Sequence, residues 1–152
     1  MAKASILIVE DEAIVAADLA DKLERAGYAI AGTVSRGEQA VRMVRQNRPD
    51  LILMDIRLAG PLDGIEVAES LKTSTDVPVV FLSAHSDDQT IGRAGLTDPF
   101  GYILKPFEER DLKTQIEIAL YRYRAERALR DSEERYRAQY GNVPAKQVFP
   151  WI

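Results

Sequence analysis

Short apolar runs alternate with segments of helical periodicity along most of the chain. Five apolar runs that end at polar positions are typical of buried strands, and they predict strands at residues 5–9, 28–34, 51–54, 77–82 and 102–104. Between them, apolar residues recur every three or four positions, as on the buried side of an amphipathic helix. This spacing predicts helices at residues 13–26, 35–46 and 86–95. Two more helices are expected, one with Asp63 as its N-cap and one that begins at Glu108.

The alternation of strands and helices predicts an α/β fold. Near-continuous apolar strands indicate a parallel sheet with helices on both faces, and the carboxyl ends of such strands share the edge where ligands bind. Polar residues follow four of the strands. They are Glu10 and Asp11 after the first strand, Asp55 after the third, Ser83 after the fourth and Lys105 after the fifth. We therefore expect these side chains to meet in one crevice.

Composition excludes several other kinds of site. The 152 residues are 46% hydrophobic, which suits one domain with its own core. The absence of cysteine and the single histidine, His85, exclude disulfides and make Cys or His metal sites a poor interpretation. The net charge of −4 gives no basic surface for nucleic acid. No apolar stretch is long enough to span a membrane, so we expect a soluble, cytoplasmic protein without nucleic-acid or membrane partners.

The residues in the expected crevice suit phosphoryl chemistry. Clustered carboxylates repel one another unless a cation holds them, and hard oxygen ligands favour Mg²⁺. Lys105 supplies a positive charge and Ser83 a hydroxyl for a phosphoryl group, which leaves Asp55 as the natural nucleophile.

Four segments around these residues together resemble the receiver domain of two-component response regulators. They are IVEDE at 8–12, LMD at 53–55, FLSA at 81–84 and GYILKPF at 101–107, within a resemblance that covers about residues 3–122. The resemblance implies a doubly wound, flavodoxin-like, five-stranded parallel sheet in the order 2-1-3-4-5. It also implies a cis peptide bond between Lys105 and Pro106.

The same resemblance implies a role for each residue. Asp55 is the phosphoacceptor, which a histidine kinase or a phosphotransfer protein phosphorylates, and Ser83 and Lys105 contact the phosphoryl group. Mg²⁺ is held by Glu10, Asp11, Asp55 and the backbone carbonyl of Arg57. Ser83 and Tyr102 form the switch. Such a domain is not an enzyme in the usual sense, because only slow self-phosphorylation from small donors and self-dephosphorylation are expected.

The chain departs from the family pattern in three places. Glu10 stands where many relatives have Asp, and its longer side chain can place a water molecule between carboxylate and metal. The loop 57–64 is one residue longer than the commoner receiver loop. Arg57 lies two residues after Asp55, at a position that tunes the lifetime of the phosphoryl group in the family.

Other function classes remain open at this point. A receiver-like module that binds partners without phosphorylation would share the fold. A phosphatase resembling haloacid dehalogenases needs a second acid two residues after the nucleophile, where this chain has Arg57. A flavodoxin-like FMN binder would bring its phosphate against the crowded acids.

The C-terminal part of the sequence predicts an extension of the last helix. We expect a receiver domain at 1–122, a helical linker at 123–140 and an irregular tail at 141–152, or the truncated start of a further domain. A second apolar stripe on this helix, away from the one that suits the sheet, predicts a homodimer; it contains Ile118, Tyr121, Ala125 and Leu129. The segment SEERYRA at 132–138 resembles the entry to a PAS sensory domain.

Overall fold

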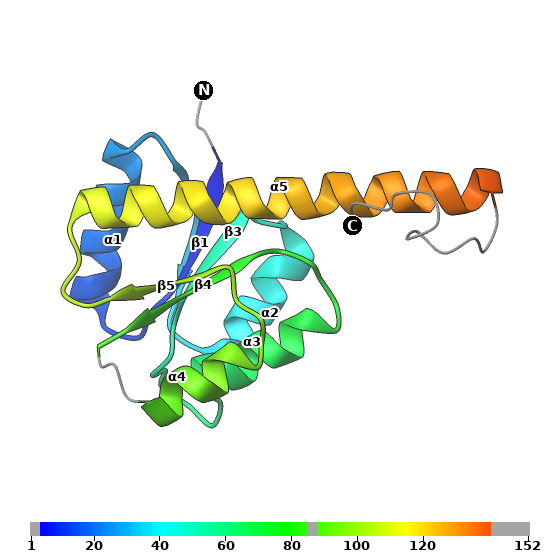
Figure 1. Cartoon of the computed structure of the whole chain (residues 1–152). Helices are drawn as coiled ribbons and strands as arrows, with labels where there is room; N and C mark the ends of the chain where they lie inside the picture. Colours follow the sequence, from blue (N-terminus) through cyan, green and yellow to red (C-terminus); the bar gives the residue numbers. More distant parts are fainter. Residues whose placement is uncertain (1–3, 85–87, 141–152) are drawn as a thin grey trace. The chain divides into compact units, whose positions relative to one another are not determined.

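The expected strands and helices all form, with ends shifted by one or two residues. The computed structural model describes residues 4–84 and 88–140 (Figure 1). His85 and the expected irregular tail at 141–152 lie outside the described residues. The strands are β1 (Ser5–Val9), β2 (Ala29–Val34), β3 (Leu51–Asp55), β4 (Val79–Ser83) and β5 (Gly101–Leu104). The helices are α1 (Ala13–Arg25), α2 (Gly37–Gln46), α3 (Gly64–Lys72), α4 (Asp88–Gly95) and α5 (Glu109–Tyr140).

The five strands form one parallel sheet in the order β2-β1-β3-β4-β5, which confirms the predicted fold class and strand order. The register aligns the carboxyl ends of neighbouring strands: Val9 pairs with Met54, and Asp55 pairs with Leu82. Ser83 in turn pairs with Leu104, the residue before Lys105. The polar residues that follow the strands consequently share one edge of the sheet.

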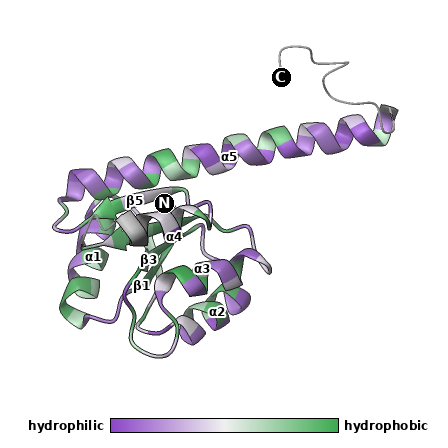
Figure 2. Ribbon diagram, turned by 60° about the horizontal axis from the view of Figure 1, so that its bottom comes forward, coloured by the Kyte–Doolittle hydropathy of each residue, from purple (hydrophilic) through white to green (hydrophobic). Residues whose placement is uncertain are grey.

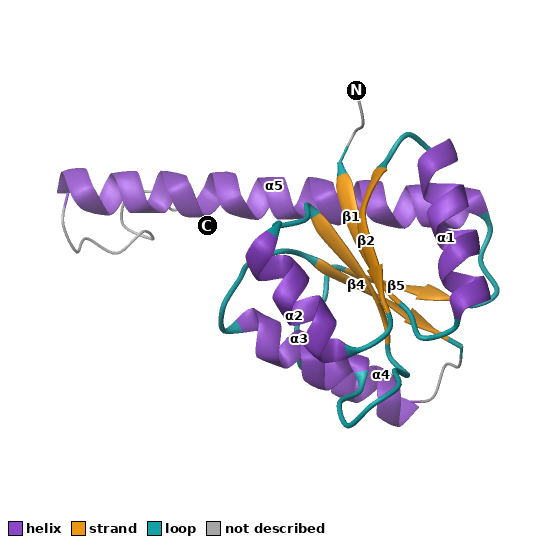
Figure 3. Ribbon diagram, turned by 180° about the vertical axis from the view of Figure 1, so that it is seen from behind, coloured by secondary structure: helices purple, strands orange, loops and turns teal. Residues whose placement is uncertain are grey.

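The sheet separates two hydrophobic cores because successive strand residues point to opposite faces. Leu53 packs with α1 and the first turns of α5, whereas its neighbours Ile52 and Met54 pack with α2, α3 and α4. Figure 3 shows α1 on one side of the strands and α2, α3 and α4 on the other. Both faces of β3 are fully covered, which explains its continuous apolar sequence.

The chain forms two compact units, Met1–Leu120 and Tyr121–Ile152, and the residues of helix α5 are divided between them. In the first unit, Leu112, Ile116 and Ala119 are buried against the sheet. In the second, residues 121–140 are helical and mostly hydrophilic, with apolar residues interspersed (Figure 2). Among the described residues, no helix is both long and apolar enough to cross a membrane.

Candidate functional site

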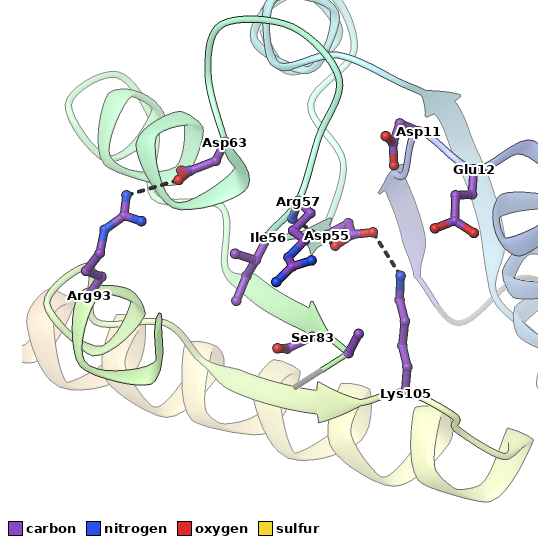
Figure 4. A pocket seen from close by; sticks show the side chains of 10 residues that line it. Asp11, Glu12, Asp55, Ile56, Arg57, Asp63, Ser83, Arg93 and Lys105 are labelled. Atoms are coloured by element: carbon purple, nitrogen blue, oxygen red, sulfur yellow. Dashed lines mark hydrogen bonds and ion pairs between the residues drawn. The ribbon is translucent and has the colours of Figure 1, made fainter. Parts of the chain in front are cut away.

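The loops at the carboxyl edge of the sheet surround a pocket of about 450 Å³ (Figure 4). All five side chains that were expected to follow the strands lie at this edge, and four of them line this pocket. The lining residues are Asp11, Glu12, Asp55, Ile56, Arg57, Asp63, Ser83, Ala84, Arg93 and Lys105. Glu10 is buried and does not line the pocket, but one of its carboxylate oxygens lies within 4.8 Å of oxygens of Asp11 and Asp55.

Asp55 is buried, and both of its carboxylate oxygens accept hydrogen bonds. Its Oδ1 accepts a hydrogen bond from the backbone N–H of Arg57 at 3.0 Å, and its Oδ2 accepts one from Lys105 Nζ at 2.8 Å. The start of α3 packs directly against its backbone, since a Cβ at Gly64 would overlap the Asp55 carbonyl oxygen. The Gly64 N–H also donates to the Ile56 carbonyl at 2.7 Å. Because Gly64 has no side chain, α3 can begin directly against the backbone of Asp55.

Lys105 is the cation that joins the acidic residues. Its Nζ lies 2.8 Å from Asp55 Oδ2 and 3.2 Å from Glu10 Oε2, while its backbone N–H donates to the Ser83 carbonyl at 2.8 Å. The following bond to Pro106 is cis, as the resemblance implied. Burial alone would lower the pKa of Lys105, but Asp55 and Glu10 together raise it above its ordinary value. The lysine consequently stays charged next to the carboxylates.

Glu10 is the buried member of the acidic cluster. Its Oε1 accepts from the backbone N–H of Glu12 at 3.2 Å, and the carboxylate oxygens of Glu10, Asp11 and Asp55 lie within 4.8 Å of one another. Burial, together with the hydrogen bond and charge of Asp55, raises the pKa of Glu10 from 4.5 to about 7. Such a set of hard oxygen donors, with one exposed member in Asp11, fits Mg²⁺.

Ser83 and Tyr102 lie on neighbouring strands near the pocket. Ser83 ends β4 and is buried, whereas Tyr102 on β5 is half-buried with its ring centre 6.0 Å from that of Phe81. The Tyr102 hydroxyl lies 3.9 Å from the place of a Cβ at Gly95, the last residue of α4. Burial raises the pKa of Tyr102, so the ring is uncharged at neutral pH. Tyr102 thus connects β5 to the end of α4.

An ion pair at the far side of the pocket was not anticipated from the sequence. Asp63 caps α3 as expected, since its Oδ1 accepts from the Glu66 N–H at 2.9 Å. Its other oxygen, Oδ2, bonds Arg93 of α4 at 3.0 Å. The two residues are thirty positions apart on different helices. Asp63 and Arg93 meet because α4 packs beside α3. The residues around Arg93 in the sequence therefore give no indication that it lies at the pocket.

Comparisons with known proteins agree on one family. Residues 6–117 match the response regulator receiver domain family. The chain is 37% identical over 124 residues to the transcriptional regulatory protein PdtaR of Mycobacterium tuberculosis, covering 82% of this chain and 60% of that protein. It is 33% identical over 118 residues to the transcriptional regulatory protein AfsQ1 of Streptomyces coelicolor, covering 78% and 52%. The chain thus spans only 52 to 60% of the length of these relatives.

Solved structures give the same result. The signal receiver domain of a modulated diguanylate cyclase from Desulfovibrio desulfuricans superposes with a TM-score of 0.76 at 40% identity, covering 81% of this chain and 98% of that one. The N-terminal domain of a response regulator/sensory box/GGDEF 3-domain protein from Carboxydothermus hydrogenoformans has a TM-score of 0.74 at 37% identity. That match covers 80% of this chain and 98% of the other.

The raised pKa of Glu10 predicts how stability changes with pH in the absence of divalent cations. Unfolded Glu10 releases its proton near pH 4.5, whereas folded Glu10 retains it until about pH 7. Because the folded state binds more protons in this window, its contribution to stability is present at low pH and is lost as the pH rises. One proton gives a slope of at most about 1.4 kcal/mol per pH unit.

Urea unfolding of the wild type and of Glu10→Gln between about pH 5 and about pH 7.5, with a chelator present, measures this contribution. We expect stability to fall less steeply with pH in Glu10→Gln, because the amide cannot titrate. Equal slopes in the two proteins would contradict the assignment of the shifted pKa to Glu10.

Proposed function

Because the chain belongs to the response regulator receiver family, we propose that it accepts a phosphoryl group on Asp55 from a histidine kinase or a phosphotransfer protein. The observation that carries the proposal is the position of Asp55, whose Oδ2 lies 2.8 Å from Lys105 Nζ at the pocket shared with Ser83 and Asp11. A carboxylate fixed beside a cation and a hydroxyl is suited to receive a phosphoryl group and to stabilise its oxygens.

In the proposed transfer, a carboxylate oxygen of Asp55 attacks the phosphorus of a phosphohistidine. The new P–O bond forms an acyl phosphate as the P–N bond breaks, and the imidazole leaves with its electron pair. Lys105 and Ser83 contact the transferred oxygens. We propose that Glu10, Asp11, Asp55 and the Arg57 carbonyl hold Mg²⁺, with Glu10 acting through water. The metal would supply positive charge to the cluster and to the phosphoryl oxygens.

The rival functions fit this site less well. A phosphatase of the haloacid-dehalogenase type needs an acid at the place of Arg57, whose side chain is a cation. A receiver that acts without phosphorylation has no need of the bonds between Lys105 and the two buried carboxylates. We therefore propose a signalling phosphoacceptor whose own chemistry is limited to slow self-phosphorylation from small donors and self-dephosphorylation.

Intact-mass spectrometry after incubation with Mg²⁺ and a small phosphodonor tests the acceptor. The wild type should gain the mass of one phosphoryl group, and Asp55→Asn should lose this gain completely because an amide is a poor nucleophile. Asp76→Asn, which neutralises an aspartate in the loop before β4, serves as the control and should behave as the wild type does. A chelator should suppress the reaction. Retention of the mass gain in Asp55→Asn would place the acceptor elsewhere.

We propose that Ser83 and Tyr102 carry the signal from the pocket to α4 and β5. A phosphoryl group on Asp55 would draw the Ser83 hydroxyl toward itself and open space beside β4. The Tyr102 ring, whose hydroxyl lies next to Gly95, could turn into that space and change the face formed by α4 and β5.

Ser83→Ala separates phosphorylation from this response. We expect Asp55 to be phosphorylated in the variant but the phosphorylation-dependent NMR shifts around Tyr102 to shrink by half or more, since the methyl group cannot bond the phosphoryl oxygens. An unaltered pattern of shifts in phosphorylated Ser83→Ala would contradict the coupling.

We further propose that α5 forms a homodimer and leads into a following domain. Exposed apolar side chains recur along this helix: Ile118 is 47% exposed, Tyr121 73% and Leu129 55%. A second copy would remove this area from water at a gain of about 25 cal/mol per Å². In our proposal residues 1–122 form the receiver, 123–140 a signalling helix and 141–152 a tail or the start of a further domain. The sensory box in the name of one related protein is consistent with this arrangement.

Analytical ultracentrifugation tests the dimer at tens of micromolar protein. The wild type should sediment as a dimer, and a variant with both Ile118→Glu and Leu129→Glu should shift toward monomer because the new charges repel across the pair of helices. Ile14→Glu changes a more exposed isoleucine on α1 and should leave the dimer intact. A monomeric wild type, with and without a phosphoryl group, would contradict dimerisation.

A further inference from the structure

The charges around the pocket are separated into two sides. Figure 4 shows Asp11 and Glu12 on one side of Asp55, and Arg57 followed by the pair of Asp63 and Arg93 on the other. We call these the acidic side and the basic side. On the acidic side, Asp11, Asp55 and, through water, Glu10 would hold the proposed Mg²⁺. The proposed function gives the side chains on the basic side no role, although Arg57 and Arg93 both line the cavity.

Arg93 is suited to bind a second anion. Its bond to Asp63 Oδ2 involves one terminal nitrogen, and a guanidinium offers five N–H donors in a planar fork. The side chain remains 51% exposed, so it can turn within the open part of the cavity. Guanidinium groups bind phosphate oxygens through charge-assisted, frequently bidentate hydrogen bonds, as they bind carboxylates. A phosphoryl dianion can therefore share Arg93 with Asp63.

We propose that Arg93, flanked by Arg57, binds the anionic phosphodonor at the mouth of the pocket before transfer and makes the charge of the donor a determinant of the rate. This role rests on the proposed phosphorylation of Asp55. Asp63 holds Arg93 at the pocket and at the same time offsets part of its charge. Donors with two negative charges, such as acyl phosphates, are favoured over donors with less negative charge.

Two substitutions in the same ion pair distinguish this role from a steric gate. Arg93→Gln removes the docking cation, whereas Asp63→Asn removes the competing anion and keeps an oxygen that can cap α3. A gate formed by the ion pair would open in both variants, so both rates would change in the same direction. An electrostatic docking role requires opposite effects.

The experiment measures the second-order rate of phosphorylation of the full chain with two donors. Acetyl phosphate is a dianion near neutral pH, whereas phosphoramidate carries a protonated amino group and less net negative charge. For acetyl phosphate we expect Arg93→Gln to slow the reaction about 2- to 5-fold at low salt and Asp63→Asn to accelerate it. The phosphoramidate rate should change by less than half as much, and added salt should reduce all of these differences.

A matched ion pair at the opposite edge of the sheet supplies the control. Arg48 and Asp76 lie 2.6 Å apart in the loops before β3 and β4, with exposures of 50% and 33% against 51% and 29% for Arg93 and Asp63. Arg48→Gln and Asp76→Asn make the same changes in net charge, and both should leave the two donor rates within experimental error of the wild type.

Several outcomes would overturn the docking role. Equal effects of Arg93→Gln on the two donors would show a structural contribution only, and parallel effects of Arg93→Gln and Asp63→Asn would show a gate. If the substitutions of Arg48 and Asp76 changed the phosphorylation rates as much as those of Arg93 and Asp63 do, the rates would depend on the net charge of the protein alone. Failure of the wild type to accept a phosphoryl group from either donor would contradict the proposed function itself, and the docking role with it.

Discussion

The gathering of three carboxylates at one edge of the sheet is the constraint around which the site is built. Like charges at this distance repel, and the repulsion is stronger where burial excludes water. Lys105 offsets part of it through bonds to Glu10 and Asp55, and protonation of Glu10 below about pH 7 offsets more. The repulsion that remains makes the pocket a favourable place for positive charge, which a divalent cation can supply.

The sheet makes this concentration of charge possible by holding its sources on rigid elements. Asp55 ends β3 and Lys105 follows β5, and the register of the parallel strands fixes how close they can come. Gly64 then allows α3 to begin against the Asp55 backbone. The carboxylates of Glu10 and Asp55, at the ends of the paired strands β1 and β3, are held closer together than carboxylates on a surface loop would be. The two hydrophobic cores bury both faces of β3, and the free energy gained by this burial offsets the unfavourable repulsion between the carboxylates.

The sequence predicted the features that depend on local pattern. The strand order and the meeting of Asp55 with Lys105 followed from strands that end in polar residues and from motifs of the family, and the N-cap at Asp63 followed from its position before an apolar helix. The pairing of Asp63 with Arg93 could not be predicted, because it depends on the packing of two helices. The raised pKa of Glu10 also required the structure, since burial and the distance to Asp55 determine it.

The loop between β3 and α3 is fixed at both ends, and Leu58 and Leu62 within it pack against the core, so that only a short turn between them is free of such contacts. At one end the Arg57 N–H bonds Asp55, and at the other Asp63 caps α3 beside Gly64. Ala59 and Gly60 between these anchors are exposed, and Gly60 has a positive φ of 98° that favours a turn. The chain can gain or lose residues at this exposed turn while Asp55 stays in place. The turn is thus a suitable position for grafting a reporter peptide that reads the occupancy of the pocket.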